Sequence, residues 1–159
     1  MGSSNAVLTS NGVFQEFSKV ESKKVIKLPL FSQKIGASVP SSIDDFHVEN
    51  YLDINELLIK NKDHTFLFYV YGNSMEPEIK HGDQIIVDTL IPQKMSLEEL
   101  NGRNIIACLN NEYTLKRLKL INKNIYLVPE NPDFNKIKVN SYDDFRVYGL
   151  VTSSIRFLR

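Results

Sequence analysis

The stretch that most constrains the fold is Thr65 to Tyr71 (TFLFYVY), which is followed at once by Gly72, Asn73 and Ser74. A run made almost entirely of β-branched and aromatic residues predicts a buried strand. Glycine and asparagine let the backbone turn through conformations that most residues avoid, so Ser74 is predicted in a tight turn at the end of this strand. Backbone N–H groups of such a turn could hold an oxyanion, although an ordinary turn capped by a hydroxyl is the alternative.

A second constraint is the segment YTLKRLKL, residues 113–120. Strand alternation puts four of its side chains on one face: Thr114, Lys116, Leu118 and Leu120. Arg117 and Lys119 fall on the other face, so Lys116 is the lysine expected to be buried among leucines. Burial disfavours the charged ammonium and can lower a lysine pKa from about 10.4 by up to roughly 3 to 5 units. Lys116 could then act as a general base for Ser74, whereas a lysine that reaches into water could not.

Several short motifs occur in the order found in the LexA-like self-cleaving serine peptidases, which use a serine and lysine dyad, and the chain resembles that family from about Leu28 to its C-terminus. The motifs are LPLFS at 28–32, DINELLI at 53–59, GNSM at 72–75, HGDQIIVD at 81–88, TLK at 114–116 and LVPENP at 127–132. The first two resemble the UmuD-like members in particular, which are accessory subunits of an error-prone DNA polymerase.

The fold expected from both the residues and the resemblance is mostly β, a twisted antiparallel sheet with short helices and an extended N-terminal arm. Residues 1–40 are predicted to form the arm and residues 41–159 the peptidase domain. Further strands are predicted at 84–88, 105–109, 113–121, 124–129 and 145–157, and short helices after Asp53 and Ser96.

The resemblance implies a self-processing serine peptidase of the DNA-damage (SOS) response, with Ser74 as nucleophile and Lys116 as base. It also implies a homodimer whose cleavage is induced by RecA nucleoprotein filaments. The trimmed form would join a UmuC-like DNA polymerase in translesion synthesis. No cofactor is implied.

The expected scissile bond joins Ala37 and Ser38, in an extended segment with a small-residue run that a peptidase can draw into its cleft as a strand. The family usually has glycine on the leaving side of this bond, so Ser38 is expected to slow the cut or to shift it by one bond. Residues 1–37 hold five lysines against two glutamates, a net charge of +3, whereas residues 38–59 hold five acids and neither lysine nor arginine. These two stretches either attract one another or form two solvated faces.

Composition argues against several classes of protein. Charge is balanced at 19 basic and 19 acidic residues without a basic patch that includes aromatics, so direct nucleic-acid binding is not expected. Residues 12–27 are too few for a helix-turn-helix domain. The three histidines are scattered and Cys108 stands alone in a predicted buried strand, so neither a metal site nor an internal disulfide is predicted. No apolar run is long enough to span a membrane, which leads us to expect a soluble cytoplasmic protein.

Three alternatives remain open at this point. The chain could be a non-catalytic interaction module that retains the dyad as a relic. It could be the peptidase part of a LexA-like repressor that lacks its DNA-binding domain. It could instead use a triad of Ser74, His81 and Asp83, although both partners lie in the turn directly after the serine, which is too local to build a second wall of a site.

Overall fold

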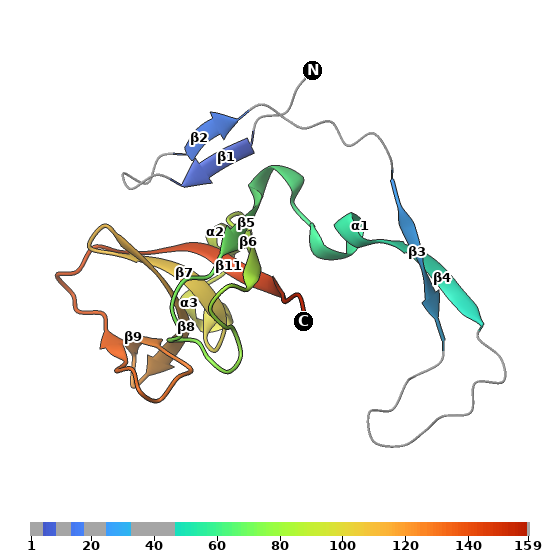
Figure 1. Cartoon of the computed structure of the whole chain (residues 1–159). Helices are drawn as coiled ribbons and strands as arrows, with labels where there is room; N and C mark the ends of the chain where they lie inside the picture. Colours follow the sequence, from blue (N-terminus) through green and yellow to red (C-terminus); the bar gives the residue numbers. More distant parts are fainter. Residues whose placement is uncertain (1–4, 9–13, 18–24, 33–46, 159) are drawn as a thin grey trace. The chain divides into compact units, whose positions relative to one another are not determined.

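The structure, a computed structural model, describes residues 5–8, 14–17, 25–32 and 47–158. It divides into two compact units, one formed by residues 1–19 and 61–159 and the other by residues 20–60 (Figure 1). The predicted domain boundary after residue 40 and the predicted scissile bond between Ala37 and Ser38 lie outside the described residues. Both therefore stay predictions.

The larger unit is built on a seven-stranded antiparallel sheet with the order β10-β9-β8-β7-β11-β6-β5. Its strands are β5 (Thr65–Tyr69), β6 (Gln84–Asp88), β7 (Asn104–Leu109), β8 (Glu112–Ile121), β9 (Asn124–Val128), β10 (Ile137–Lys138) and β11 (Phe145–Ile155). The short elements of this unit are β1 (Asn5–Leu8), β2 (Phe14–Phe17), η1 (Lys62–His64), α2 (Ile91–Lys94) and α3 (Leu97–Leu100). The mostly-β prediction is therefore confirmed, and the predicted helix after Ser96 is present with Ser96 as its N-cap.

Two buried clusters pack against this sheet. One contains Leu100, Ile105, Ala107, Leu118, Leu127 and Leu150, and the other contains Val70, Met75, Ile79, Ile85 and Val87. Ile105 and Ala107 belong to the first cluster while Ile106 packs against the second, and successive residues of a strand point to opposite faces. The clusters therefore lie on opposite faces of the sheet. Leu118 and Leu120 share the first cluster, as strand alternation in β8 predicts.

The prediction of a strand buried throughout at Thr65 to Tyr71 is wrong. β5 ends at Tyr69 and forms the edge of the sheet, where Leu67 is 56%, Tyr69 78% and Tyr71 94% exposed. Phe68 and Val70, on the alternate positions, pack into the second cluster. Composition predicted the strand correctly, but an aromatic strand with one solvated face has the same composition as one buried on both faces.

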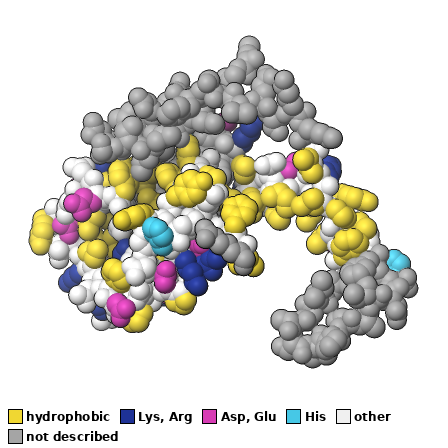
Figure 2. Space-filling model, in the orientation of Figure 1, with side chains coloured by type: hydrophobic (Ala, Val, Ile, Leu, Met, Phe, Trp, Pro, Cys, Tyr) yellow, Lys and Arg dark blue, Asp and Glu magenta, His cyan; other side chains and the backbone are white. Residues whose placement is uncertain are grey.

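The smaller unit is a hairpin of β3 (Lys27–Phe31) and β4 (Val48–Asp53), followed by α1 (Ile54–Leu58). Leu28 lies opposite Leu52, and the Asp53 carboxylate caps the helix by accepting from the backbone N–H of Asn55 at 2.8 Å. Every residue of β3 is exposed, and hydrophobic side chains cover much of the visible face of the hairpin (Figure 2). Among the described residues, no helix is long and apolar enough to cross a membrane.

Gly149 lies where the register of β11 against β7 shifts and where there is no room for a side chain. A Cβ atom at this position would overlap Val87 Cγ1 and lie 3.4 Å from the carbonyl oxygen of Asp88. Val87 is 1% exposed and β-branched, so it has little freedom to move away. The fold therefore requires glycine at this position.

We predict that Gly149→Ala lowers the free energy of unfolding by about 1 to 3 kcal/mol, because the added methyl overpacks the second core cluster. Denaturant unfolding measures this change. Ser154→Ala, at an exposed position of the same strand, is the control and should change the stability by less than about 0.5 kcal/mol. Equal stability of Gly149→Ala and the wild type would show that this contact is not tight.

Candidate functional site

The turn that carries Ser74 is closed at its base by two backbone hydrogen bonds. Val70 donates to the carbonyl of Asp83 and Gly82 donates to the carbonyl of Val70, both at 2.8 Å. Gly72 has φ +91°, a conformation that favours glycine. Met75 is 2% exposed and belongs to the second core cluster, so the turn is anchored one residue after the serine. Ser74 itself is half-buried.

The structure brings Ser74 and Lys116 together, as the sequence predicts. Lys116 Nζ lies 3.0 Å from Ser74 Oγ, 3.0 Å from Thr114 Oγ1 and 2.9 Å from the carbonyl oxygen of Leu115. Burial lowers the pKa of the Lys116 ammonium. A neutral amine has two N–H donors and one lone pair, so donation to Thr114 and to Leu115 leaves the lone pair to accept the Ser74 hydroxyl proton.

The role of Thr114 in this arrangement was not predicted from the sequence. The signal was present, because Thr114 lies two residues before Lys116 and therefore on the same face of β8. Its hydroxyl holds one amine proton, which fixes the direction of the lone pair.

A second loop, which follows β9 in the chain, supports the Ser74 turn. The backbone N–H of Asn131 donates to the carbonyl of Ser74, and Asn131 Nδ2 donates to the carbonyl of Asn73, both at 3.0 Å. Sequence reasoning noted Asn131 only as part of a motif. Ser74 and Met75 do not donate their backbone N–H groups to any acceptor in the described part of the chain, so both groups are available to an oxyanion.

A small cleft of about 160 Å³ lies at this contact. Its lining comes from two segments: Val70, Tyr71, Gly72, Ser74 and Met75, and residues 113–116 of β8. Ser74 and Lys116 therefore meet in the cleft, although they are 42 residues apart in the chain. A serine hydroxyl beside a depressed-pKa amine and free N–H groups is the arrangement that acyl transfer requires.

The alternative triad does not form. His81 Nδ1 accepts the backbone N–H of Gly72 at 3.0 Å, and its ring stacks edge-on against Tyr71. Asp83 is instead paired with Arg156, whose Nε donates to it at 2.8 Å, and the guanidinium holds the pKa of the Asp83 carboxyl below its usual value. Both side chains are thus used in holding the turn, and neither orients the other toward Ser74.

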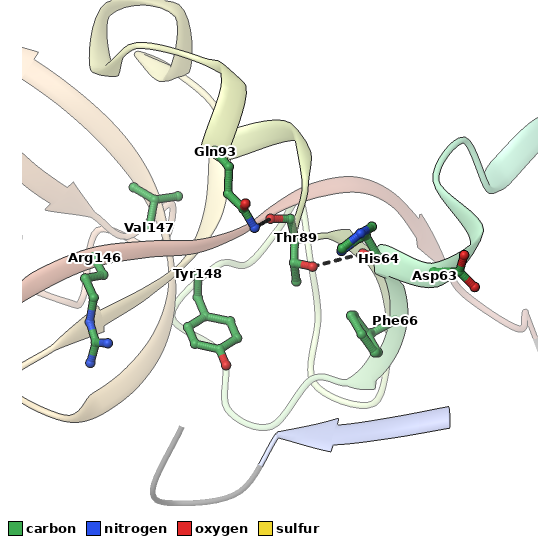
Figure 3. A pocket seen from close by; sticks show the side chains of 8 residues that line it. All are labelled: Asp63, His64, Phe66, Thr89, Gln93, Arg146, Val147 and Tyr148. Atoms are coloured by element: carbon green, nitrogen blue, oxygen red, sulfur yellow. Dashed lines mark hydrogen bonds between the residues drawn. The ribbon is translucent and has the colours of Figure 1, made fainter. Parts of the chain in front are cut away.

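A larger hollow of about 510 Å³ lies around η1, β5 and β11, and Figure 3 shows its lining. The residues are Asp63, His64, Phe66, Thr89, Gln93, Arg146, Val147 and Tyr148. Thr89 donates its hydroxyl hydrogen to the backbone carbonyl of His64 rather than to the imidazole, so the two do not form a nucleophile and base pair.

Cys108 is buried and carries a free thiol, as predicted from its apolar surroundings. In the ranges that the structure describes, no group of three histidine, cysteine, aspartate or glutamate side chains could hold a metal ion.

Comparison with known proteins gives consistent matches. A model of the family "Peptidase S24-like" matches residues 29–152, a range that contains both Ser74 and Lys116. Protein MucA of Salmonella typhimurium is 30% identical over 141 residues, which are 87% of this chain and 91% of MucA. The LexA repressor of Syntrophotalea carbinolica is 32% identical over 89% of this chain and 65% of its own length. The LexA repressor of Bordetella parapertussis is 36% identical over 81% of this chain and 56% of its own length.

Proposed function

Because the chain belongs to the Peptidase S24-like family, we propose that it is a self-processing serine peptidase that cuts its own N-terminal arm. Family membership supports a serine-peptidase kind of activity. The observation that carries the finer assignment is the 3.0 Å contact between Lys116 Nζ and Ser74 Oγ, made by a lysine whose pKa is lowered by burial. In this proposal Ser74 is the nucleophile and Lys116 is the general base.

The reaction starts when Ser74 Oγ attacks the carbonyl carbon of Ala37 and Lys116 Nζ accepts the hydroxyl proton. Backbone N–H groups of the turn hold the oxyanion of the tetrahedral intermediate. The carbon–nitrogen bond to Ser38 then breaks, and Lys116 returns the proton to the leaving amine. Water, activated by the neutral Lys116, hydrolyses the acyl-enzyme and releases the arm.

The wider role that we propose is in the DNA-damage (SOS) response. The protein is a homodimer, RecA nucleoprotein filaments stimulate the cut, and the trimmed form serves as accessory subunit of a UmuC-like error-prone DNA polymerase. Support comes from the UmuD-like motifs and from the match to MucA along almost its whole length.

A second candidate is the peptidase part of a LexA-like repressor. It is supported by the LexA matches, of which this chain spans 65% and 56%. A RecA filament that stimulates cleavage fits both candidates, whereas binding of the trimmed form to a UmuC-like polymerase fits only the first.

We predict that cleavage without a stimulator speeds up as pH rises and then levels off, because only the neutral amine can accept the Ser74 proton. Burial lowers the pKa of Lys116 in the folded protein, so the inflection should fall below the ordinary lysine value of about 10.4. Lys116→Arg should be inactive because a guanidinium keeps its proton at these pH values. Gel densitometry of the intact chain over time gives the rate.

Ser74→Ala is the control that should abolish the cut, and His81→Ala is the control that should retain it. A rate that stays flat between about pH 6 and pH 10 would contradict the dyad. A non-catalytic module would show no cleavage under any of these conditions, even with an activated RecA filament.

The second prediction concerns the bond that is cut. Intact-mass analysis should show a new N-terminus at Ser38, because Gly36-Ala37-Ser38 is the small-residue run of the arm's extended segment and Pro40 cannot donate a strand hydrogen bond. The product, with 14 basic and 17 acidic side chains, should migrate as a more acidic species. An N-terminus at Ala37 would move the bond by one residue, and one beyond Pro40 would contradict the assignment.

A further inference from the structure

Arg117, the residue directly after the proposed base, connects three separate segments of the chain. Its Nε donates to Glu130, one terminal nitrogen donates to Glu78, and the other donates to the carbonyl of Gly102 at 2.7 Å. We propose that Arg117 is a positioning residue, whose guanidinium holds the two loops around Ser74 at the distance from Lys116 that proton transfer requires. This inference rests on the proposed function.

The first connection runs through Glu78, four residues after Ser74. Ile79, the residue after Glu78, donates its backbone N–H to the carbonyl of Met75 at 2.9 Å, so this bond closes the turn around the segment from Met75 to Glu78. Asn104 Nδ2, from β7, holds the other oxygen of Glu78 at 3.2 Å. A shift of Glu78 would therefore move the turn against the sheet.

The second connection runs through Glu130, whose neighbour Asn131 makes both of the contacts that hold the carbonyls of Ser74 and Asn73. Arg117 thus fixes Glu130, and Asn131 in turn fixes the nucleophile. Since Arg117 and Lys116 are adjacent in β8, the strand that carries the base also anchors both supports of the serine.

The chemistry of this network requires arginine. Three N–H groups point in three directions to two carboxylates and one carbonyl, which a single ammonium on a flexible stem cannot reproduce. The Arg117 side chain is 22% exposed and that of Glu130 is 29% exposed, so their charge-assisted contacts are only partly screened by water. The pair of Arg146 and Asp144, at 58% and 59% exposure, contacts neither loop and gives a matched control.

The test measures stimulator-free self-cleavage of the full chain across the pH range for Arg117→Gln, Glu130→Ala and Arg146→Gln. We expect Arg117→Gln and Glu130→Ala each to lower the plateau rate at high pH on the order of 10- to 100-fold, because the reacting atoms lose their alignment. Arg146→Gln should stay within roughly twofold of the wild type. A thermal unfolding curve of each variant, with a melting temperature well above the assay temperature, confirms that the variant is folded during the assay.

Arg117→Gln and Glu130→Ala together separate positioning from charge. If Arg117 acted only through its charge on the pKa of Lys116, removal of the cation and removal of the anion would shift the inflection in opposite directions and leave both plateaus unchanged. That result would overturn the inference. Arg117→Lys keeps the charge without the fork, so a wild-type plateau in that variant would also overturn it.

If Arg117→Gln does not fold, Glu130→Ala decides the question, since it removes the acceptor of Arg117 Nε and keeps Arg117 and its contact with Glu78. A wild-type plateau in Glu130→Ala then refutes the inference. Failure of the proposed function looks different: the wild type would not cut itself, or Ser74→Ala would cut equally fast. Dyad-dependent cleavage with unchanged plateaus in both Arg117→Gln and Glu130→Ala would refute the role of Arg117 alone.

Discussion

The site depends on one unfavourable step, the removal of the Lys116 amine from water on folding. A charged ammonium loses hydration there, and each unit by which its pKa falls corresponds to about 1.4 kcal/mol between the charged and neutral forms. The sheet supplies that environment by placing β8 against the turn after β5, so that Lys116 Nζ meets the hydroxyls of Ser74 and Thr114. This loss of hydration is what lowers the pKa of Lys116 below the ordinary lysine value.

The desolvated site is supported by its surroundings. Met75 anchors the Ser74 turn in the second core cluster, Asn131 donates to the carbonyl of Ser74, and Asp83 pairs with Arg156. Arg117, in β8, pairs with Glu78 and with Glu130, the neighbour of Asn131. Ser74 and Lys116 are thus held by connected contacts, although they are 42 residues apart in the chain.

The sequence predicted those parts of the site that follow from local patterns. Alternation in β8 predicted Lys116 as the buried lysine, and the structure leaves it half-buried with a lowered pKa. A strand followed by Gly72 and Asn73 predicted the turn of Ser74. The exposed face of β5 could not be predicted, because composition does not distinguish an edge strand from a central one. The supporting contact of Asn131 joins residues 58 apart. Such contacts depend on the register of strands that do not neighbour one another in the chain, and no local pattern reports that register.

The most direct test of the account is the pKa of Lys116 itself, measured by NMR titration of the lysine side-chain Cε and Nζ resonances in the uncleaved Ser74→Ala chain. Lys116→Met identifies the resonance by its loss. The account predicts that Lys116 loses its proton at a lower pH than the exposed lysines, which should titrate near 10.4. Titration of Lys116 together with the exposed lysines would contradict the claim that burial creates the base.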